Sequence, residues 1–494
     1  MNFFEAVRPE EAGVSSHWIE RFIDTIEENN FCLHSCIMMK NQKVIFETYW
    51  EPVVQDELHR LYSATKSFVS IAIGLLIDKG LLSFEDKIIK FFPDLIDANK
   101  LHPYVAEATV RDLLRMATPF SEPTYGDPDI SGKDWLASYF STPANHPSGT
   151  IYNYDSCGSY VLGAIVKRIT GKHFYEFLRE EMLDEMGFNK ESRCLLGPDK
   201  ESWAGSGCLV STRDFAKFAL MLLNKGKWNG RQMISEAYVT AATTKQVDNN
   251  TDGEKDPWHC GYGYQFWIFK DGAFCMLGAS SQIAICVPKY DFIFVCTADT
   301  LGRHGSGYDR IFSALWKEIV DKLGGGPIED MSAYERLTKR CSNLKIAPVC
   351  GKPHSDSVNE INDVTFKMHD NPMQISELSL HLEENCGRLH YRNSRGDKEI
   401  VFGIGECISD TFPETHFHGE ILGESVNREF RSVNSGAWVE ENKFVIRCDI
   451  IDMYVGNLTI TLCFKGDEVA LSMYKNAQFF LKEYDGYAGG FAAE

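Results

Sequence analysis

The chain has 494 residues, of which 44% are hydrophobic and 24% charged, and this length predicts two or three domains of ordinary globular composition. Its formal net charge of −20 argues against binding to nucleic acid or to an anionic membrane surface. The 15 cysteines are an odd number without zinc-ligand spacing, so we expect a reducing compartment and no metal.

The N-terminus lacks a basic segment followed by an apolar core, so no signal peptide is expected. The longest apolar run, residues 68–77, is shorter than the ~20 residues that span a bilayer. It is apolar on all sides and predicts a buried helix that stops at Gly80. We therefore expect a cytoplasmic protein without a membrane partner.

The region before residue 325 alternates between strand-like and helix-like segments. Helices are expected at 9–28 (capped by Ser15 or Ser16), from Thr109 with a capping-box-like pattern, and at 160–170, 215–223 and 311–323. Strands are expected at 35–40 and 43–50, joined by a two-residue turn at Asn41-Gln42, and at 261–269, 272–278, 283–287 and 292–297. Residues 121–150, rich in Pro, Gly, Ser and Asp, predict a long surface loop.

This order predicts an α+β architecture. Strands near both ends of the region are expected to form one antiparallel sheet covered by the first and last helices, with a helical lobe between them. A site is expected in the cleft between sheet and lobe.

A Gly-rich linker at 324–327 is the clearest boundary in the chain. We expect residues 1–325 to form the first domain, 326–362 a helix and linker, and 363–494 an antiparallel β-rich domain. In that last part, strand-like stretches alternate with turn residues, at 377–382, 388–391, 399–404, 444–451, 458–464 and 469–473. Its sequence offers no chemistry of its own.

The buried helix carries the first candidate site. Ser63 and Lys66 lie three residues apart at its start and therefore on one face, in the S-x-x-K arrangement of serine acyl-enzymes. Burial would lower the basicity of the lysine beside a nucleophilic hydroxyl. Two other S-x-x-K matches, Ser342/Lys345 and Ser472/Lys475, do not open a buried helix. The alternative for Ser63 is a plain helix cap next to a solvated lysine.

Two further segments could complete this site. Tyr154 lies at a turn just before a helix, and a phenolate is favoured next to a lysine ammonium, so either member of such a pair could take the serine proton. The strand that ends at Gly278-Ala279 could supply one backbone N–H of an oxyanion hole, with the Ser63 N–H as the other. Each segment alone also fits an ordinary turn.

Leu61-Tyr-Ser63-Ala-Thr-Lys66, Tyr154-Asp-Ser156 and Gly278-x-x-Ser281-Gln282 together resemble the class C β-lactamase-related serine hydrolases. This family includes penicillin-binding proteins, D-Ala-D-Ala carboxypeptidases, D-aminopeptidases, EstB-type esterases and 6-aminohexanoate-dimer hydrolase. The resemblance extends over residues 7–325, with motifs closest to the last two groups. It implies a β-lactamase/DD-peptidase-like fold, an antiparallel sheet flanked by helices plus a helical lobe. Appended β domains are common in this family, where they could cover the cleft or mediate assembly, but the C-terminal β-rich part of this chain lies outside the resemblance.

The resemblance also implies roles for individual residues. Ser63 would be the acylated nucleophile, Lys66 would share its proton, and Tyr154 would be the base in acylation and then the acid. Ser156 occupies a position usually held by Asn, and the N–H groups of Ser63 and Ala279 would bind the oxyanion.

The chain also departs from the family pattern. Where the family has Lys or His before x-Gly, this chain has Met276, so the cation that often contacts a substrate carboxylate is missing. Because Ser156 stands where the family usually has Asn, one side-chain amide contact to the substrate is missing as well. These differences weaken the case for a true β-lactamase or cell-wall carboxypeptidase and leave acyl transfer intact.

We therefore expect a serine hydrolase that cleaves a small ester or amide through an acyl-enzyme on Ser63, without a cofactor. The alternatives are a peptidase for D-amino-acid peptides, a penicillin-binding-type sensor that acylates once, and a scaffold whose β domain is the working part. The aromatic residues near the motifs could line the pocket or belong to the core; they are Phe120, Tyr125, Trp258, Tyr262 and Trp267. Whether the chain forms a homo-oligomer stays open.

Overall fold

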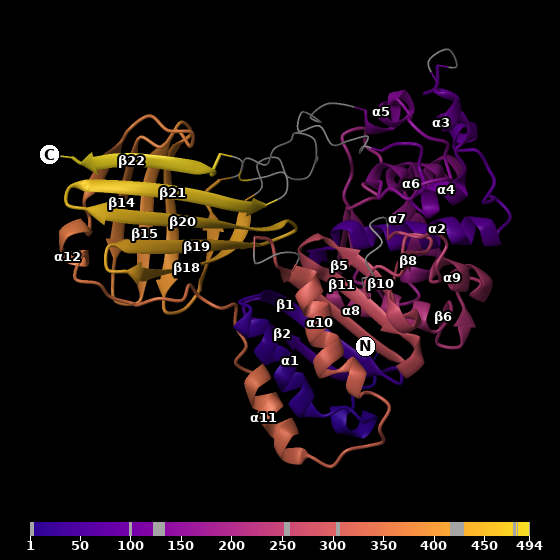
Figure 1. The fold of residues 1–494 in the computed structure, drawn as a ribbon, viewed down its shortest axis with the longest axis horizontal. Helices are drawn as coiled ribbons and strands as arrows, with labels where there is room; N and C mark the ends of the chain where they lie inside the picture. The colour runs from indigo at the N-terminus through magenta and orange to yellow at the C-terminus, as the bar shows by residue number, and fades with distance from the viewer. Residues whose placement is uncertain are drawn as a thin grey trace.

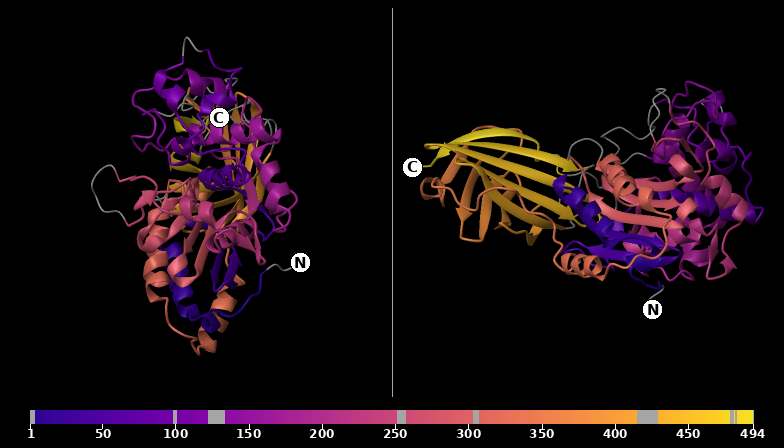
Figure 2. Two further views of the ribbon diagram at one scale, coloured as in Figure 1. Left: turned by 90° about the vertical axis from the view of Figure 1, so that its right-hand side faces the viewer. Right: turned by 60° about the horizontal axis from the view of Figure 1, so that its bottom comes forward.

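The computed structural model describes residues 4–97, 101–121, 134–250, 257–302, 307–414, 429–477, 481 and 483–493. Figure 1 shows two bodies, one of mixed helices and strands and one a β-barrel built from the C-terminal part of the chain. The C-terminus lies at the end of the barrel that points away from the first body (Figure 2). Among the described helices, none has both the length and the apolar character needed to cross a membrane.

The first body is organised around a seven-stranded sheet in the order β2-β1-β12-β11-β10-β9-β8. Its strands are β1 (Cys32–Lys40), β2 (Lys43–Tyr49), β8 (Gly261–Tyr262), β9 (Trp267–Ile268), β10 (Phe274–Gly278), β11 (Gln282–Val287) and β12 (Phe292–Asp299). The predicted pairing between the two ends of the region is confirmed, because β1 pairs antiparallel with β12. The predicted hairpin is also confirmed, with positive φ at both Asn41 and Gln42.

Helices cover both faces of this sheet. Alternate residues of β1 divide between the two layers: Cys36 and Met38 pack with α1 (Ser16–Glu28) and α10 (Gly307–Glu318), whereas Ile37 and Met39 face the side of α8 (Thr212–Leu223). Side-chain oxygens begin two of these helices, because Ser15 caps α1, as predicted, and Ser211 caps α8. The sheet is therefore buried on both sides.

The helical lobe is built around α2 (Thr65–Asp78), which is buried from Thr65 to Leu76. It also contains α3 (Pro103–Glu107), α4 (Val110–Leu114), α5 (Trp135–Ser141), α6 (Ser156–Thr170), α7 (Phe174–Leu178) and α9 (Glu236–Ala242). The predicted ends are confirmed at Gly171, which closes α6, and at Thr109, which forms a capping box with Asp112. The chain therefore enters the lobe through the helix that carries the S-x-x-K motif.

Short segments connect these elements. The short strands are β3 (Leu58–Arg60), β4 (Arg193–Cys194), β5 (Cys208–Ser211), β6 (Lys227–Trp228) and β7 (Arg231–Gln232). The short helical turns, which are 3₁₀ except for the π-helical η4, are η1 (Pro9–Ala12), η2 (Tyr62–Ala64), η3 (Ile88–Phe91), η4 (Arg179–Leu183), η5 (Lys270–Gly272), η6 (Ala279–Ser281), η7 (Pro288–Tyr290) and η8 (Val320–Lys322). β3, β5 and β4 form a small sheet of their own beside the start of α2.

Three predictions in this body are wrong. The single helix expected at 9–28 is interrupted at Gly13, whose φ is 74°, so a short 3₁₀ turn at Pro9–Ala12 is separate from α1. The segment 121–150 contains the helix α5, because Asp134 caps it and Trp135, Leu136, Tyr139 and Phe140 are buried. The single strand expected over 261–269 is two short strands, since the chain turns between β8 and β9 at Gln265, which has a positive φ of 67°.

The C-terminal body is a closed β-barrel. Its strands are β13 (Thr365–Met368), β14 (Glu377–Leu382), β15 (Cys386–Asn393), β16 (Gly396–Ile404), β17 (Ile408–Phe412), β18 (Phe430–Glu440), β19 (Lys443–Ile451), β20 (Val455–Lys465), β21 (Glu468–Ala477) and β22 (Gly486–Ala492). Antiparallel ladders run from β16 through β13 and β22 to β18, and a parallel pairing of β16 with β18 closes the ring. The predicted strands lie within β14, β15, β16, β19, β20 and β21.

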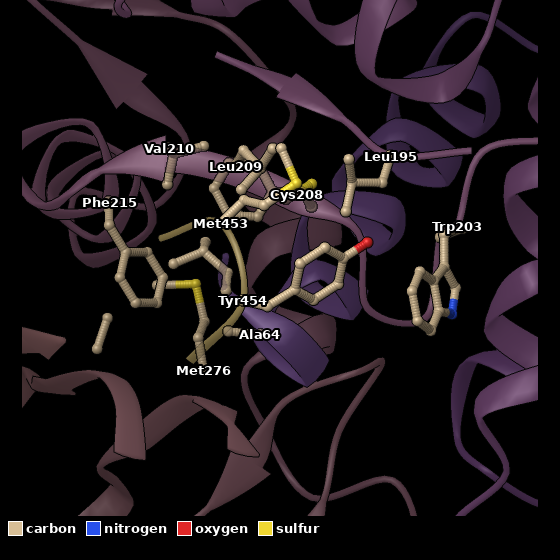
Figure 3. Packing of buried hydrophobic residues seen from close by; sticks show 14 of the residues in the cluster. Ala64, Leu195, Trp203, Cys208, Leu209, Val210, Phe215, Met276, Met453 and Tyr454 are labelled. Carbon is tan, nitrogen blue, oxygen red and sulfur yellow. The ribbon is translucent and has the colours of Figure 1, made fainter. Parts of the chain in front are cut away.

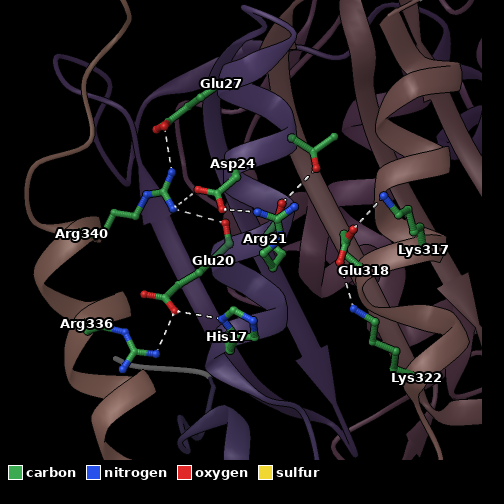
Figure 4. Close-up of polar contacts among 11 residues, drawn as sticks. His17, Glu20, Arg21, Asp24, Glu27, Lys317, Glu318, Lys322, Arg336 and Arg340 are labelled. Atoms are coloured by element: carbon green, nitrogen blue, oxygen red, sulfur yellow. Dashed lines mark hydrogen bonds and ion pairs between the residues drawn. The ribbon is translucent and has the colours of Figure 1, made fainter.

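The helix expected after the Gly-rich linker is α11 (Met331–Cys341), and it packs against α1 of the first body. Ion pairs fix this contact: Arg340 lies 2.6 Å from Asp24 and 2.8 Å from Glu27, and Arg336 lies 3.4 Å from Glu20 (Figure 4). A short helix, α12 (Val358–Ile361), precedes the barrel.

Candidate active site

Ser63 lies in the turn η2, directly before α2. The preceding residue, Tyr62, has a left-handed backbone with φ of 48°, a conformation that is uncommon for an aromatic residue. The backbone on either side is held by hydrogen bonds, from Leu61 N–H to the Cys208 carbonyl (2.8 Å) and from Cys208 N–H to Thr65 Oγ1 (3.0 Å). The turn therefore presents the Ser63 side chain at a fixed place on the first turn of the helix.

Lys66 lies directly below this serine. Its Nζ is 3.0 Å from Ser63 Oγ and 2.6 Å from the carbonyl oxygen of Gly205. The side chain is buried, and this burial lowers the pKa of Lys66 to about 7. The Asp155 carboxylate partly opposes the shift, and the Arg60 cation adds a smaller lowering. A neutral amine here would donate to Gly205 and keep its lone pair for the serine proton.

Tyr154 completes the group from the segment before α6. Its phenol shares a hydrogen bond with Ser63, and Lys66 Nζ lies 5.0 Å from the centre of its ring. Burial raises the pKa of this phenol, and the bond with Ser63 only partly opposes that shift. Trp267 stacks on the Tyr154 ring at 5.4 Å, and Tyr262 meets it edge-on at 6.3 Å. Tyr154 is therefore held as a neutral phenol.

The end of strand β10 lies against the nucleophile turn. A Cβ at Gly278 would come within 2.0 Å of the Leu61 carbonyl oxygen, so only glycine allows this approach. β9 pairs with β10 only at Phe274 and Cys275, which leaves the last residues of β10 as an edge at this point. Ala279 follows directly, so its N–H lies at the edge where an oxyanion hole is expected.

The other predicted pocket residues divide into two groups. Trp267 and Tyr262 contact Tyr154, and Ser156 is the first residue of α6, two positions further along the chain. Phe120 and Trp258 lie in the core, which is the second of the two possibilities left open for them: Phe120 is buried in the helical lobe against Tyr139, and Trp258 packs against Trp316 of α10. Tyr125 lies outside the described residues.

The other two S-x-x-K matches form no comparable pair. Ser342 Oγ donates to the Lys339 carbonyl, and Lys345 is exposed near Glu51. Lys475 Nζ donates to the Ala477 carbonyl on strand β21. The buried Ser63–Lys66 contact thus distinguishes the first match from the other two.

Sequence reasoning missed Arg60. Its side chain is fully buried, and its guanidinium lies over three rings, at 4.1 Å from Trp203, 4.3 Å from Tyr62 and 4.8 Å from Tyr454. It donates to the carbonyl and to the hydroxyl of Ser206 at 3.0 and 2.9 Å. No signal in the sequence marked it, because Asp56, Glu57 and His59 come just before it and make it one polar residue among several.

The sequence did not indicate which residues of the barrel reach the first body. Met453 and Tyr454, from the turn between β19 and β20, lie among Ala64, Cys208 and Trp203 of the first body (Figure 3). Met276, at the position where the family has a cation, is buried in the same cluster. This strand therefore supplies an apolar side chain where a positive charge was missing from the sequence pattern.

Residues 35–315 match the family described as Beta-lactamase, and the chain belongs to this family. It is 23% identical over 224 residues to 6-aminohexanoate-dimer hydrolase of Paenarthrobacter ureafaciens, a match that covers 42% of this chain and 56% of that relative's length. The family includes hydrolases and esterases, which agrees with the grouping of Ser63, Lys66 and Tyr154.

Solved structures share the fold of the first body. A putative 6-aminohexanoate-dimer hydrolase from Bacillus anthracis superimposes with a TM-score of 0.54 at 20% identity, covering 66% of this chain and 89% of its own. A penicillin-binding-protein homologue from Caulobacter crescentus gives 0.51 at 17% identity, covering 64% and 98%. Both confirm the β-lactamase-like fold that the motifs predicted.

Proposed function

We propose that the protein is a serine hydrolase that cleaves a small ester or amide through an acyl-enzyme on Ser63. The observation that carries the proposal is the contact of 3.0 Å between Ser63 Oγ and the Nζ of Lys66, whose pKa burial lowers to about 7. A buried lysine of that basicity, beside a hydroxyl, is the arrangement that activates a serine nucleophile.

Acylation would proceed with Lys66 as the base. Ser63 Oγ attacks the substrate carbonyl, its proton passes to the neutral Lys66 amine, and the N–H groups of Ser63 and Ala279 stabilise the oxyanion. Tyr154, kept protonated by its raised pKa, then gives its proton to the leaving group and regains one from Lys66. Water reverses these transfers in deacylation. This division differs from the base role that the family resemblance implied for Tyr154.

The substrate class follows from the surroundings of the site. Met276 is buried and uncharged, so β10 offers no cation for a substrate carboxylate. Trp267, partly exposed beside Tyr154, offers an aromatic face instead. These features favour a small acyl group without a negative charge, and the similarity to a relative named 6-aminohexanoate-dimer hydrolase supports hydrolysis as the reaction.

Intact mass after exposure to a fluorophosphonate, together with release of nitrophenol from p-nitrophenyl acetate, tests the proposal. We expect one adduct on the wild type, none on Ser63→Ala, and one on Ser342→Ala, the matched variant of another S-x-x-K serine. Continuing nitrophenol release would show turnover. Equal labelling of wild type and Ser63→Ala, or a single burst without further product, would contradict a working hydrolase.

A further inference from the structure

The turn between β19 and β20 is the part of the barrel that reaches the proposed active site. Met453 and Tyr454 of this turn and Val455, the first residue of β20, are buried, with 5% of Met453 and none of the other two exposed. Figure 3 shows Met453 and Tyr454 beside Ala64, Cys208 and Trp203 of the first body. This turn makes two separate contacts with the segments that hold Ser63 and Lys66.

The first contact fixes the residue before the nucleophile. The Tyr62 hydroxyl accepts a hydrogen bond from the Val455 N–H at 3.1 Å and donates one to the Val455 carbonyl at 3.3 Å. Tyr62 has the left-handed backbone described above, and such a conformation persists only where its surroundings hold it. The barrel thus supports the backbone that orients Ser63.

The second contact reaches Lys66 through an arginine. The Tyr454 ring covers the Arg60 guanidinium, which holds Ser206 by its carbonyl and hydroxyl. The adjacent carbonyl, that of Gly205, accepts the 2.6 Å hydrogen bond from Lys66 Nζ. A chain of contacts therefore leads from the barrel to the proposed base.

We propose that the β19–β20 turn is part of the active site, with Tyr62 and Tyr454 as positioning residues that hold the side chains of Ser63 and Lys66 in their positions relative to each other. The expected loss of activity rests on the proposed function, whereas the expected loosening of the segments around Ser63 and Lys66 does not. It makes the first body catalytically incomplete without the barrel, whose sequence alone offers no chemistry.

One contact between the two bodies and one inside the barrel provide matched controls. Arg431 of the barrel pairs with Glu57 of the first body at 2.6 Å, and Tyr484 hydrogen-bonds Tyr391 at 2.8 Å inside the barrel. Arg431→Gln therefore weakens the junction, and Tyr484→Phe weakens the barrel, without touching the contacts of Tyr62 or Tyr454.

The test compares Tyr62→Phe and Tyr454→Ala with these controls in the full chain. Hydrogen–deuterium exchange should rise in peptides covering 60–68 and 203–208 of both test variants, and the rate of fluorophosphonate labelling should fall about 10- to 100-fold. In Tyr454→Ala, water can reach Arg60 and Lys66, and the pKa of Lys66 should rise because the amine is less buried. The pH at which the labelling rate falls on the acid side should therefore be higher than in the wild type. Tyr454→Phe keeps the ring and should rescue both exchange and rate.

The outcomes separate the two proposals. Exchange and labelling equal to those of Arg431→Gln and Tyr484→Phe would overturn the positioning role, and so would exchange raised evenly over the whole chain. Raised exchange confined to the two peptides, in a protein whose wild type takes no label at Ser63, would support the structural coupling while the hydrolase function fails.

Discussion

Buried charge is handled differently inside the barrel and around Ser63. In the barrel, Glu414 is 3% exposed, and two cations face it, Arg395 at 3.5 Å and Lys398 at 3.6 Å. In the first body, Lys66 and Arg60 are 1% and 0% exposed, and no ion pair joins either of them to a carboxylate among the described residues. Carbonyl oxygens and aromatic faces hold them instead.

This difference has an energetic meaning. A buried charge without a partner of opposite sign costs stability, because desolvation is not offset by Coulomb attraction. Such a cost is kept where a perturbed pKa is useful, as for a base that must be neutral near neutral pH. In the barrel the buried Glu414 is paired and has a structural role. The predictions below test whether Lys66 and Arg60, which are not paired, have a catalytic one.

The largest effect is expected from Lys66→Met. Removing the amine leaves Ser63 without its base, so kcat/KM for p-nitrophenyl acetate should fall by ~10²- to 10⁴-fold while the fold is kept. Steady-state kinetics and circular dichroism measure both. Undiminished hydrolysis in Lys66→Met would assign the base role to another group.

A smaller loss is expected from Gly278→Ala. The new methyl group would collide with the Leu61 carbonyl, 2.0 Å from the Cβ position, and push the Ala279 N–H away from Ser63. Loss of one oxyanion donor should lower kcat by ~10²-fold. Gly325→Ala is the matched control, because its Cβ would meet nothing within 4 Å. Equal activity of the two variants would show that the end of β10 does not contribute to the oxyanion hole.

Arg60→Met should change the pH profile. Without the neighbouring cation the pKa of Lys66 rises, so the acid limb of the labelling rate should move to higher pH, with activity regained in alkaline buffer. Arg60→Lys, which keeps the charge, should move the limb less. A limb at the same pH in all three proteins would show that Arg60 has only a structural role.

The smallest effect on activity is expected from Tyr484→Phe in the barrel. Loss of the 2.8 Å hydrogen bond with Tyr391 should lower the free energy of unfolding by about 1 kcal/mol. The kcat/KM should stay within error of the wild type, as measured alongside urea denaturation. A loss of activity in Tyr484→Phe would contradict the view that this part of the barrel has only a structural role.

Local patterns in the sequence predicted the elements that hold the site. The i, i+3 spacing of Ser63 and Lys66 and the two-residue turn at Asn41 depend on nearby residues alone, and both are confirmed in geometry. The helix α5 was missed because its apolar residues lie in a stretch whose Pro and Gly content indicates a loop.

What could not be predicted depends on distant contacts. The Tyr62–Val455 hydrogen bonds join residues 393 positions apart, and nothing near either residue indicates them. The strand β18 was missed because it carries Ser432, Asn434 and Ser435, polar residues that the structure nonetheless buries. β22 was missed because it contains Gly486, Gly489 and Gly490, which weaken a strand pattern.

The pH dependence of wild-type labelling at Ser63 by a fluorophosphonate tests the central claim most directly. Below its pKa Lys66 carries a proton and cannot accept another, so the rate constant should rise with pH through about 7 and then level off. A limb that appears only near the pKa of an ordinary lysine, or a rate independent of pH, would contradict the account of Lys66 as a neutral buried base.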